Sequence, residues 1–344
     1  STHCISSAAS DVYKRQITSF VSIDGTTEIQ LIKITNLSEE EQEVTPIVAI
    51  PVYGRSADNI RDHRHVTSLL HRIDTKECGV EVTPVLSFDE RGHQKNDTTY
   101  FVYGFTAEGN APKEFYPTVE SFIGEGGSFL IPEAVRVEKT GCTAGCHLEG
   151  KEAVGAFRFE RRKLKANESI EYVVLAGATG EKASISKICT LFGTKEQAEN
   201  ELTKVKKYWT EKVNVEFETG DEATDNYLKW ICFQPILRRI YGCSFLPYHD
   251  YGKGGRGWRD LWQDCLALLI MNPSNVRQMI VDNYGGVRID GTNATIIGNK
   301  QGEFIADRNN ITRVWMDHAF WPFVTTRLYP VSYTHLRAHE TEAD

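Results

Sequence analysis

The hydrophobic period changes once along this 344-residue chain, and this change constrains the fold more than any other feature. Up to about residue 176, short β-branched or aromatic runs are separated by Gly, Pro, Asn and Asp. From residue 194 onward, apolar residues recur at spacings of three and four, which is the period of an α-helix. All six tryptophans lie at or after Trp209. The sequence therefore predicts an α+β protein, with a strand-rich first part and a helical, aromatic-rich second part.

The first part predicts a β-sandwich. Residues 27–35 (TEIQLIKIT) alternate between two faces, as a strand with two different surroundings does. Further runs of this kind follow at residues 43–52, 81–86, 100–105, 156–160 and 171–176. Many short strands with turn residues between them are typical of a sandwich.

A histidine-rich segment interrupts these strands. Residues 59–71 (NIRDHRHVTSLLH) predict a helix that contains three histidines. Histidines on one helix can bind a metal ion or a substrate. We favour the other interpretation, a polar crossover helix that packs over the sheet.

The second part predicts three helices in succession. The first begins at Thr194, because Thr194 and Gln197 have the spacing of a capping box, and an apolar stripe follows. The stripe consists of Ala198, Leu202, Val205 and Trp209. The second helix is expected at residues 221–241, with a kink at Pro235. The third begins near Trp258. Its expected core face consists of Leu261, Cys265, Leu268 and Leu269.

Composition excludes several classes of protein. The net charge of -8 and the lack of a basic patch argue against a nucleic-acid partner. No apolar run approaches the ~20 residues that a membrane-spanning segment needs.

The eight cysteines are mostly isolated within apolar segments, so we expect them to be reduced and the protein to be cytoplasmic. Cys142, Cys146 and His147 lie close together, but no second ligand pair follows at a zinc-site spacing, so we favour chance proximity over a metal site.

The two ends of the chain differ from what they flank. Residues 1–16 and 331–344 share neither the period nor the composition of their neighbours, and both resemble translated sequencing-adaptor sequence. We therefore expect the natural part to run from about Ile17 to Pro330 and to be cut at both ends.

Residues 251–264 (YGKGGRGWRDLWQD) combine glycines with a dense set of polar and aromatic side chains. Glycine lets the backbone approach a ligand closely, Arg, Asp and Gln offer directional hydrogen bonds, and Trp offers flat apolar faces. This mixture is typical of a site for a polyhydroxylated ligand such as a sugar. The candidate substrate-binding residues here are Arg256, Arg259, Asp260, Gln263 and Asp264.

Two other interpretations of this stretch carry less weight. Gly252, Gly254 and Gly257 have the spacing of a dinucleotide-binding loop. That motif requires a buried strand before it, whereas residues 245–250 (FLPYHD) are polar and contain a proline. The second alternative is a flexible loop before an ordinary surface helix.

Residues 313–322 (RVWMDHAFWP) repeat the chemistry, with one carboxylate, Asp317, between aromatic residues. Aromatic surroundings desolvate a carboxylate and favour its protonated form, which keeps a proton available for a glycosidic oxygen. Helix capping is the competing interpretation, because Asp before an apolar run is a common helix start. Between the two stretches, residues 290–293 (DGTN) and 307–310 (DRNN) are either loops for substrate hydroxyls or ordinary turns.

The strand-rich part, the linker helix and the motifs GRGWRDLWQD and RVWMDHAFWPF together resemble glycoside hydrolase family 94, the inverting disaccharide and oligosaccharide phosphorylases. The resemblance is closest to the branch of 1,2-β-oligoglucan phosphorylases and the phosphorylase-like modules of cyclic β-1,2-glucan synthases. It implies a β-sandwich at residues 17–185, a helical linker at 186–217 and the N-terminal part of an (α/α)6 catalytic barrel at 218–330.

The same resemblance implies roles for individual residues. Asp317 would be the general acid, and Trp315 would line the donor glucose site. Arg256 or Arg259 would reach toward phosphate. Binding of the donor sugar is implied for Arg259, Asp260 and Asp264.

The implied reaction is phosphorolysis of β-linked gluco-oligosaccharides to α-glucose 1-phosphate, and β-1,2-glucan is the substrate we favour. A phosphorylase needs one acid and no catalytic base, because phosphate is itself the nucleophile, so we expect inorganic phosphate as co-substrate and neither cofactor nor metal. For the oligomeric state, we consider a homodimer. Because further phosphate-binding groups are expected beyond Pro330, we expect this chain itself to be inactive.

Three alternatives stay open from the sequence. One is the phosphorylase-like module of a cyclic β-1,2-glucan synthase. The second is a hydrolase that works without phosphate and needs a second carboxylate. The third is a sugar-binding protein without catalytic activity.

Overall fold

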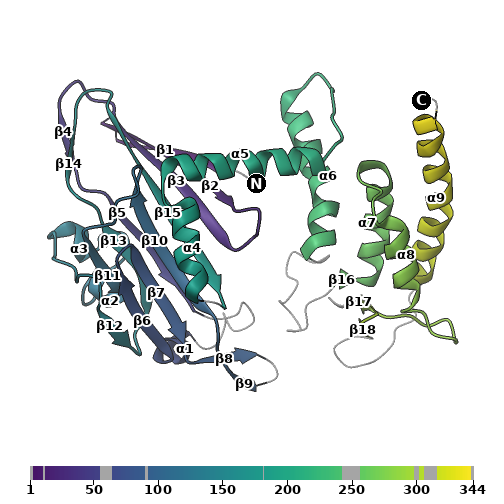
Figure 1. The fold of residues 1–344 in the computed structure, drawn as a ribbon, viewed down its shortest axis with the longest axis horizontal. Helices are drawn as coiled ribbons and strands as arrows, with labels where there is room; N and C mark the ends of the chain where they lie inside the picture. The colour runs from purple at the N-terminus through teal and green to yellow at the C-terminus, as the bar shows by residue number, and fades with distance from the viewer. Residues whose placement is uncertain are drawn as a thin grey trace. The chain divides into compact units, whose positions relative to one another are not determined.

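The computed structural model describes residues 3–10, 12–54, 64–89, 92–180, 182–241, 256–297, 302–305 and 316–341. The chain divides into two compact units, Ser1–Lys207 and Tyr208–Asp344. The first unit consists mainly of antiparallel strands and the second mainly of helices (Figure 1). The expected α+β class and the order of its two parts are confirmed.

A large antiparallel sheet forms one layer of the first unit (Figure 1). Its strands, in spatial order, are β1 (His3–Ser10), β2 (Tyr13–Val21), β3 (Thr27–Asn36), β15 (Ser169–Thr179), β10 (Thr99–Thr106), β7 (Gly79–Pro84), β6 (His71–Lys76) and β12 (His147–Glu149). The central pairing joins segments far apart in sequence, since Leu175 of β15 lies opposite both Ile29 and Tyr103. The alternating pattern of residues 27–35 therefore belongs to an interior strand.

A smaller sheet packs against the large one. It contains β11 (Glu114–Thr118), β13 (Ala153–Arg158) and β5 (Ile47–Val52), with β13 in the middle. The core lies between the two sheets and is built from apolar side chains of both. Fully buried members are Ile73, Val80, Val82, Phe157 and Val174. This arrangement confirms a sandwich.

Glycine lets the two sheets approach closely at one point. A Cβ at Gly104, on β10, would lie 2.2 Å from Cε2 of Phe157, whose ring is fully buried. We expect Gly104→Ala to lower the free energy of unfolding by about 1–3 kcal/mol, because a methyl group overpacks a closed core. Denaturant unfolding measures the change. Gly180→Ala is the matched control, since a Cβ there meets nothing within 4 Å, and an equal loss in both variants would contradict the packing argument.

Short elements complete the first unit. They are the pairs β4 (Gln42–Val44) with β14 (Arg162–Leu164) and β8 (Leu86–Asp89) with β9 (Gly92–Lys95), and the helices α1 (Arg64–Leu69), α2 (Val119–Ile123) and α3 (Glu133–Arg136). The helix expected at residues 59–71 is wrong at its end, because His71 begins β6 and pairs with Pro84. His71 is buried, with Nδ1 3.2 Å from the carbonyl oxygen of Lys151. Residues 55–63 lie outside the described residues.

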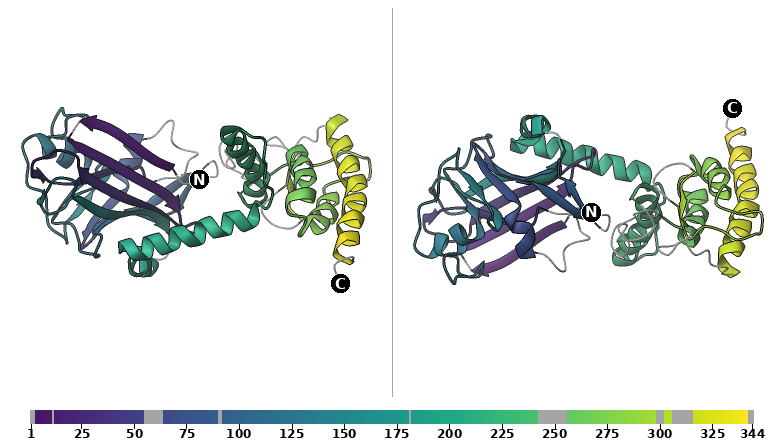
Figure 2. Two further views of the ribbon diagram at one scale, coloured as in Figure 1. Left: turned by 90° about the horizontal axis from the view of Figure 1, so that it is seen from above. Right: turned by 90° about the horizontal axis from the view of Figure 1, so that it is seen from below.

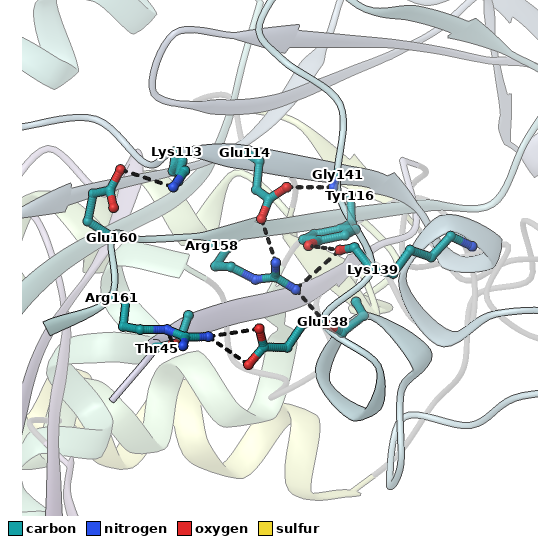
Figure 3. Close-up of polar contacts among 11 residues, drawn as sticks. Thr45, Lys113, Glu114, Tyr116, Glu138, Lys139, Gly141, Arg158, Glu160 and Arg161 are labelled. Atoms are coloured by element: carbon teal, nitrogen blue, oxygen red, sulfur yellow. Dashed lines mark hydrogen bonds and ion pairs between the residues drawn. The ribbon is translucent and has the colours of Figure 1, made fainter. Parts of the chain in front are cut away.

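A buried ion pair fastens the α3 segment to the smaller sheet (Figure 3). Glu114 and Arg158 lie opposite each other on β11 and β13, with Arg158 Nη1 2.6 Å from Glu114 Oε1. Arg158 Nη2 also donates to the carbonyl oxygens of Ala134 and Lys139, at 2.5 and 3.2 Å. The backbone N–H of Gly141 donates to Glu114 Oε2 at 2.6 Å. Two side chains thus hold three points of a loop that has little regular structure.

Two helices follow the sandwich strands, α4 (Lys182–Phe192) and α5 (Lys195–Lys212). The capping box is confirmed, because the N–H of Gln197 donates to Thr194 Oγ1 at 3.3 Å and the N–H of Thr194 donates to Gln197 Oε1 at 3.1 Å. Ala198 and Val205 of the expected stripe are buried. Glu201 is buried too, where it accepts a hydrogen bond from the N–H of Ile23.

The second unit is built around one helix, α7 (Trp258–Met271). It contacts α6 (Glu222–Tyr241), α8 (Val276–Tyr284) and α9 (Met316–Thr341), and Figure 2 shows α7, α8 and α9 grouped together. The short strands β16 (Arg256–Gly257), β17 (Ile296–Ile297) and β18 (Phe304–Ile305) form a small sheet. The expected core face of α7 is confirmed, since Leu261, Cys265, Leu268 and Leu269 are buried. None of the helices in the described ranges is both long and apolar enough to cross a bilayer.

Both expected boundaries at the chain ends fall inside regular elements. Residue 17 lies within β2, which pairs with β3 from Tyr13 onward, and residue 331 lies within α9. Strand pairing and helix formation depend on a sequence and not on its origin. The adaptor-like origin of residues 1–16 and 331–344 therefore stays a prediction, as do the domain limits drawn from it.

Candidate functional site

The N-terminal ends of α7 and α9 are tied together by Trp258. Its indole Nε1–H donates to the carbonyl oxygen of His318 at 2.9 Å, and both residues are buried. The backbone N–H of Trp258 donates to Thr295 O at 2.9 Å, which joins the start of α7 to the segment before β17. One turn further along α7, and two turns further along α9, Thr325 Oγ1 donates to the carbonyl oxygen of Trp262 at 2.9 Å. These contacts place the first turns of two helices side by side.

Arg259 and Asp317 meet at this junction. Arg259 Nη1 donates to Asp317 Oδ2 at 3.1 Å, across 58 positions of sequence. Arg259 Nε also lies 3.9 Å from Asp260 Oδ1. All three side chains stay accessible, with 47% of Arg259, 38% of Asp317 and 45% of Asp260 exposed. The structure therefore brings the two sequence motifs together in a charged, solvent-accessible group that a ligand can reach.

The other candidates on α7 differ in accessibility. Asp264, one turn beyond Asp260, is only 4% exposed, whereas Gln263 is half-buried. Trp258 and Trp262 are 1% and 0% exposed and form part of the core, with their rings 5.9 Å apart edge to face. The idea that these tryptophans offer faces to a sugar is therefore wrong: their apolar surface is used in packing α7.

Asp317 is the second residue of α9, so it lies within the first turn and is not the residue that caps the helix. A carboxylate in a first turn is favoured by the helix dipole. Arg256 forms backbone pairs with Ile297 in β16, and its side chain lies outside the described residues. Trp315 and residues 307–310 also lie outside them.

Residues 290–293 combine a turn with a contact to α9. Asp290 Oδ1 accepts from the N–H and Oγ1 of Thr292 at 3.0 and 2.7 Å, and these hydrogen bonds hold the pKa of Asp290 below its usual value. This is turn chemistry. Asn293 is instead 6% exposed, and its amide nitrogen lies 3.0 Å from His318 Nδ1.

The contact between Asn293 and His318 was outside the reach of sequence reasoning. In the sequence, Asn293 is one residue of a predicted loop and His318 is the residue after Asp317. No helical or strand spacing links the two positions. Burial lowers the pKa of the His318 imidazole, and this effect outweighs the opposing influence of the neighbouring Asp317 carboxylate. Burial thus favours the neutral form of His318.

The histidine near Cys142 and Cys146 is engaged by carboxylates. His147 Nδ1 lies 2.8 Å from Asp74 Oδ1, and Nε2 lies 3.2 Å from Glu149 Oε1. Burial raises the pKa of the Cys142 thiol to about 12, and the neighbouring Cys146 adds to the effect. Within the part of the chain that the structure describes, no group of three potential ligands could hold a metal ion, and the cysteines there are free thiols.

Solved structures give partial matches in fold. A bacterial glucoamylase in complex with acarbose matches over 95% of this chain and 47% of its own, with a TM-score of 0.52 and 9% identity. A polysaccharide lyase matches over 52% of this chain and 22% of its own, with a TM-score of 0.29 and 11% identity. A heparinase III matches over 53% and 20%, with a TM-score of 0.24 and 13% identity. The chain spans less than half the length of each, and the likeness to the glucoamylase concerns the fold alone.

Sequence comparison identifies the family. No curated protein sequence matches this chain. The family model that does match describes the supersandwich domain of glycosyl hydrolase family 94, and it covers residues 5–195. That stretch is more than half of the chain and coincides with the two-sheet unit described above. The protein therefore belongs to glycosyl hydrolase family 94.

Proposed function

We propose that this protein acts in the inverting phosphorolysis of β-linked gluco-oligosaccharides, with β-1,2-glucan as the substrate and α-glucose 1-phosphate as the product. The contact between Arg259 and Asp317 carries the proposal, because it places an acid and a cation side by side in a protein of family 94. The complementary charges match a reaction that protonates one oxygen and binds an anion.

The reaction requires one proton donor. Asp317 donates a proton to the glycosidic oxygen while a phosphate oxygen attacks the anomeric carbon from the opposite face. The bond from that carbon to the glycosidic oxygen breaks, its electron pair remains on the oxygen, and the proton from Asp317 completes the new hydroxyl. Attack from the opposite face inverts the β-linkage to α-glucose 1-phosphate. Because phosphate is already an anionic nucleophile, no second carboxylate has to activate it, in contrast to an inverting hydrolase.

Arg259 has to change partners during this reaction. An ion-paired carboxylate holds no proton to give, so the contact between Arg259 and Asp317 must open before proton transfer. Phosphate offers Arg259 a doubly charged, bidentate partner, which a planar guanidinium binds well. Entry of phosphate would thus release Asp317 for protonation. Asp260, at 3.9 Å from Arg259, would orient a hydroxyl of the donor sugar.

The remaining candidates are assigned by the same proposal. Gln263 and Asp264 would support the donor sugar from the next turn of α7, with the buried Asp264 acting at the base of the site. Arg256 would add a second cation for phosphate, and Trp315 would line the donor glucose. Inorganic phosphate is the co-substrate, and no cofactor is assigned. The enzyme is proposed to be cytoplasmic and to form a homodimer.

A phosphate-dependence assay tests the function. The longest natural protein that contains residues 17–330 is incubated with β-1,2-glucan, with and without inorganic phosphate. We expect α-glucose 1-phosphate only when phosphate is present, and little free glucose in either case. Release of glucose at the same rate without phosphate would reject phosphorolysis.

The same assay examines a second candidate function, inverting hydrolysis. Asp260 favours this candidate, because it shares Arg259 with Asp317 and would be the carboxylate that activates water. Inverting hydrolysis predicts α-glucose release that does not depend on phosphate and that Asp260→Asn removes. Phosphorolysis predicts that Asp260→Asn weakens sugar binding and leaves the requirement for phosphate in place.

A further inference from the structure

The first turn of α9 needs support from outside the helix. The first four backbone N–H groups of any helix lack partners within it, so the first turn frays more easily than the middle. Asp317 lies in this turn, as the second residue of α9. A proton donor has to be held within a fraction of an ångström of its target, and a displacement of 1 Å can cost about 100-fold in rate. Contacts that fix this turn therefore have consequences for catalysis.

His318 receives two such contacts. Its carbonyl oxygen accepts a hydrogen bond from Trp258 Nε1 at 2.9 Å, and its ring nitrogen Nδ1 lies 3.0 Å from Asn293 Nδ2. All three residues are at least nine-tenths buried. The residue that follows Asp317 is thus held at its backbone by α7 and at its side chain by the loop before β17.

The hydrogen-bond pattern determines the tautomer of His318. Asn293 Nδ2 also donates to the carbonyl oxygen of Ala294 at 2.9 Å. A carbonyl oxygen only accepts, so the amide nitrogen of Asn293 must be the atom that points this way. The same nitrogen can only donate to His318, and Nδ1 of His318 must accept. The imidazole is therefore neutral, with its proton on Nε2.

We propose that Asn293 and His318 are a positioning pair for Asp317, with Asn293 fixing the His318 ring and His318 fixing the first turn of α9. This inference rests on the proposed role of Asp317 as proton donor. Neither residue touches the reacting atoms in this role. Each acts on the rate through the place and direction of the Asp317 carboxyl group.

The first experiment needs no enzyme activity. Imidazole nitrogens of the 344-residue chain are labelled with ¹⁵N, and the signals of His318 are assigned by their loss in His318→Asn. We expect the Nε2–H tautomer near neutral pH, and a change in the tautomer balance of His318 in Asn293→Leu. An Nδ1–H tautomer in the unmodified chain would overturn the proposal, because Nδ1 could not then accept from Asn293.

The second experiment measures phosphorolysis by the natural protein. We expect Asn293→Leu and His318→Leu to lower kcat by about 30- to 100-fold, with KM for the glucan changed by less than about 3-fold. His318→Asn is the conservative variant, because its side-chain oxygen stands in for Nδ1 as an acceptor at the same distance from the backbone. We expect this variant to stay within about 5-fold of the unmodified kcat.

A buried asparagine on α8 provides the matched control. Asn283 is 5% exposed, as buried as Asn293, and lies in the same unit. Asn283→Leu is expected to keep kcat even if it lowers the melting temperature. Equal losses of kcat in Asn283→Leu and Asn293→Leu would show that Asn293 matters only for packing and would overturn the positioning role. Full kcat in both Asn293→Leu and His318→Leu would overturn it as well. If the unmodified protein shows no phosphate-dependent activity, the proposed function fails, and the tautomer measurement still decides whether the contact exists.

Discussion

Asp317→Asn is expected to lower kcat for phosphorolysis of β-1,2-glucan by about 1,000-fold, within the range that general acid catalysis contributes. The amide has nearly the shape of the carboxyl group, and its oxygen can still accept from Arg259 Nη1, so the local structure is retained. What is lost is the acidic proton. The measurement is the release of α-glucose 1-phosphate at saturating phosphate, with KM for the glucan as a check on binding.

The leaving group separates proton donation from other roles of Asp317. An aryl β-glucoside carries an acidic phenol as its leaving group, and the phenolate departs without much protonation. We therefore expect Asp317→Asn to lose less than about 10-fold with such a substrate. Asp225→Asn is the control, because Asp225 is a partly accessible acid in the first turn of α6 and accepts from the N–H of Thr219 at 2.9 Å. An equal loss with both substrates, or full activity of Asp317→Asn on glucan, would place the acid elsewhere.

Glu114→Ala is expected to destabilise the first unit by about 3–5 kcal/mol, because it leaves the Arg158 guanidinium buried without its counter-charge. The side chains of Glu114 and Arg158 are only 12% and 10% exposed, so water cannot replace the lost contact. The N–H of Gly141 loses its acceptor as well. Thermal unfolding of the whole chain should show a decrease in the melting temperature of the sandwich by about 10 °C.

Two companion variants sharpen this prediction. The double variant Glu114→Leu with Arg158→Met removes both charges, and we expect it to recover part of the loss, because a buried pair can be replaced by apolar side chains. Glu120→Ala breaks an exposed pair with Lys151, in which 69% and 54% of the side chains are accessible, and should cost less than about 1 kcal/mol. A loss below 1 kcal/mol in Glu114→Ala would show that the loop is held by other contacts.

Local patterns in the sequence predicted local structure well. The pairing of Thr194 with Gln197 and the core face of α7 depend on residues three or four positions apart, and both are confirmed. The strand at residues 27–35 was recognisable from its alternation. Which strands it would pair with was not, because β3 lies between β2 and β15, and β15 begins more than 130 positions later.

The errors came where tertiary contacts outweigh local preference. Residues 59–71 read as one helical segment, yet His71 pairs with Pro84 because β7 offers it a strand partner. Trp258 and Trp262 lie among charged residues in the sequence, so we predicted that they contact a ligand. In the structure both side chains lie on the buried face of α7, in the core. Tryptophan has enough apolar surface for either use, and only the packing of α7 decides between them.

The sequence indicated individual candidate residues of the site, but not which of them contact one another. Arg259 and Asp317 were singled out from two separate motifs, and their 3.1 Å contact adds a pairing that neither motif contains. The support of Asp317 by Asn293 and His318 has no signature in sequence, because it depends on a loop that meets a helix 25 positions later.

The division of α7 into a buried and an accessible face has a consequence for how such proteins diversify. Leu261, Cys265 and Leu268 contribute to folding, whereas Arg259 and Asp260 on the accessible side contribute little to the core. Mutations on the accessible side can therefore accumulate without a large loss of stability. Substitutions on the accessible side can also change which ligand is bound, while the packing of the opposite side keeps the helix in place.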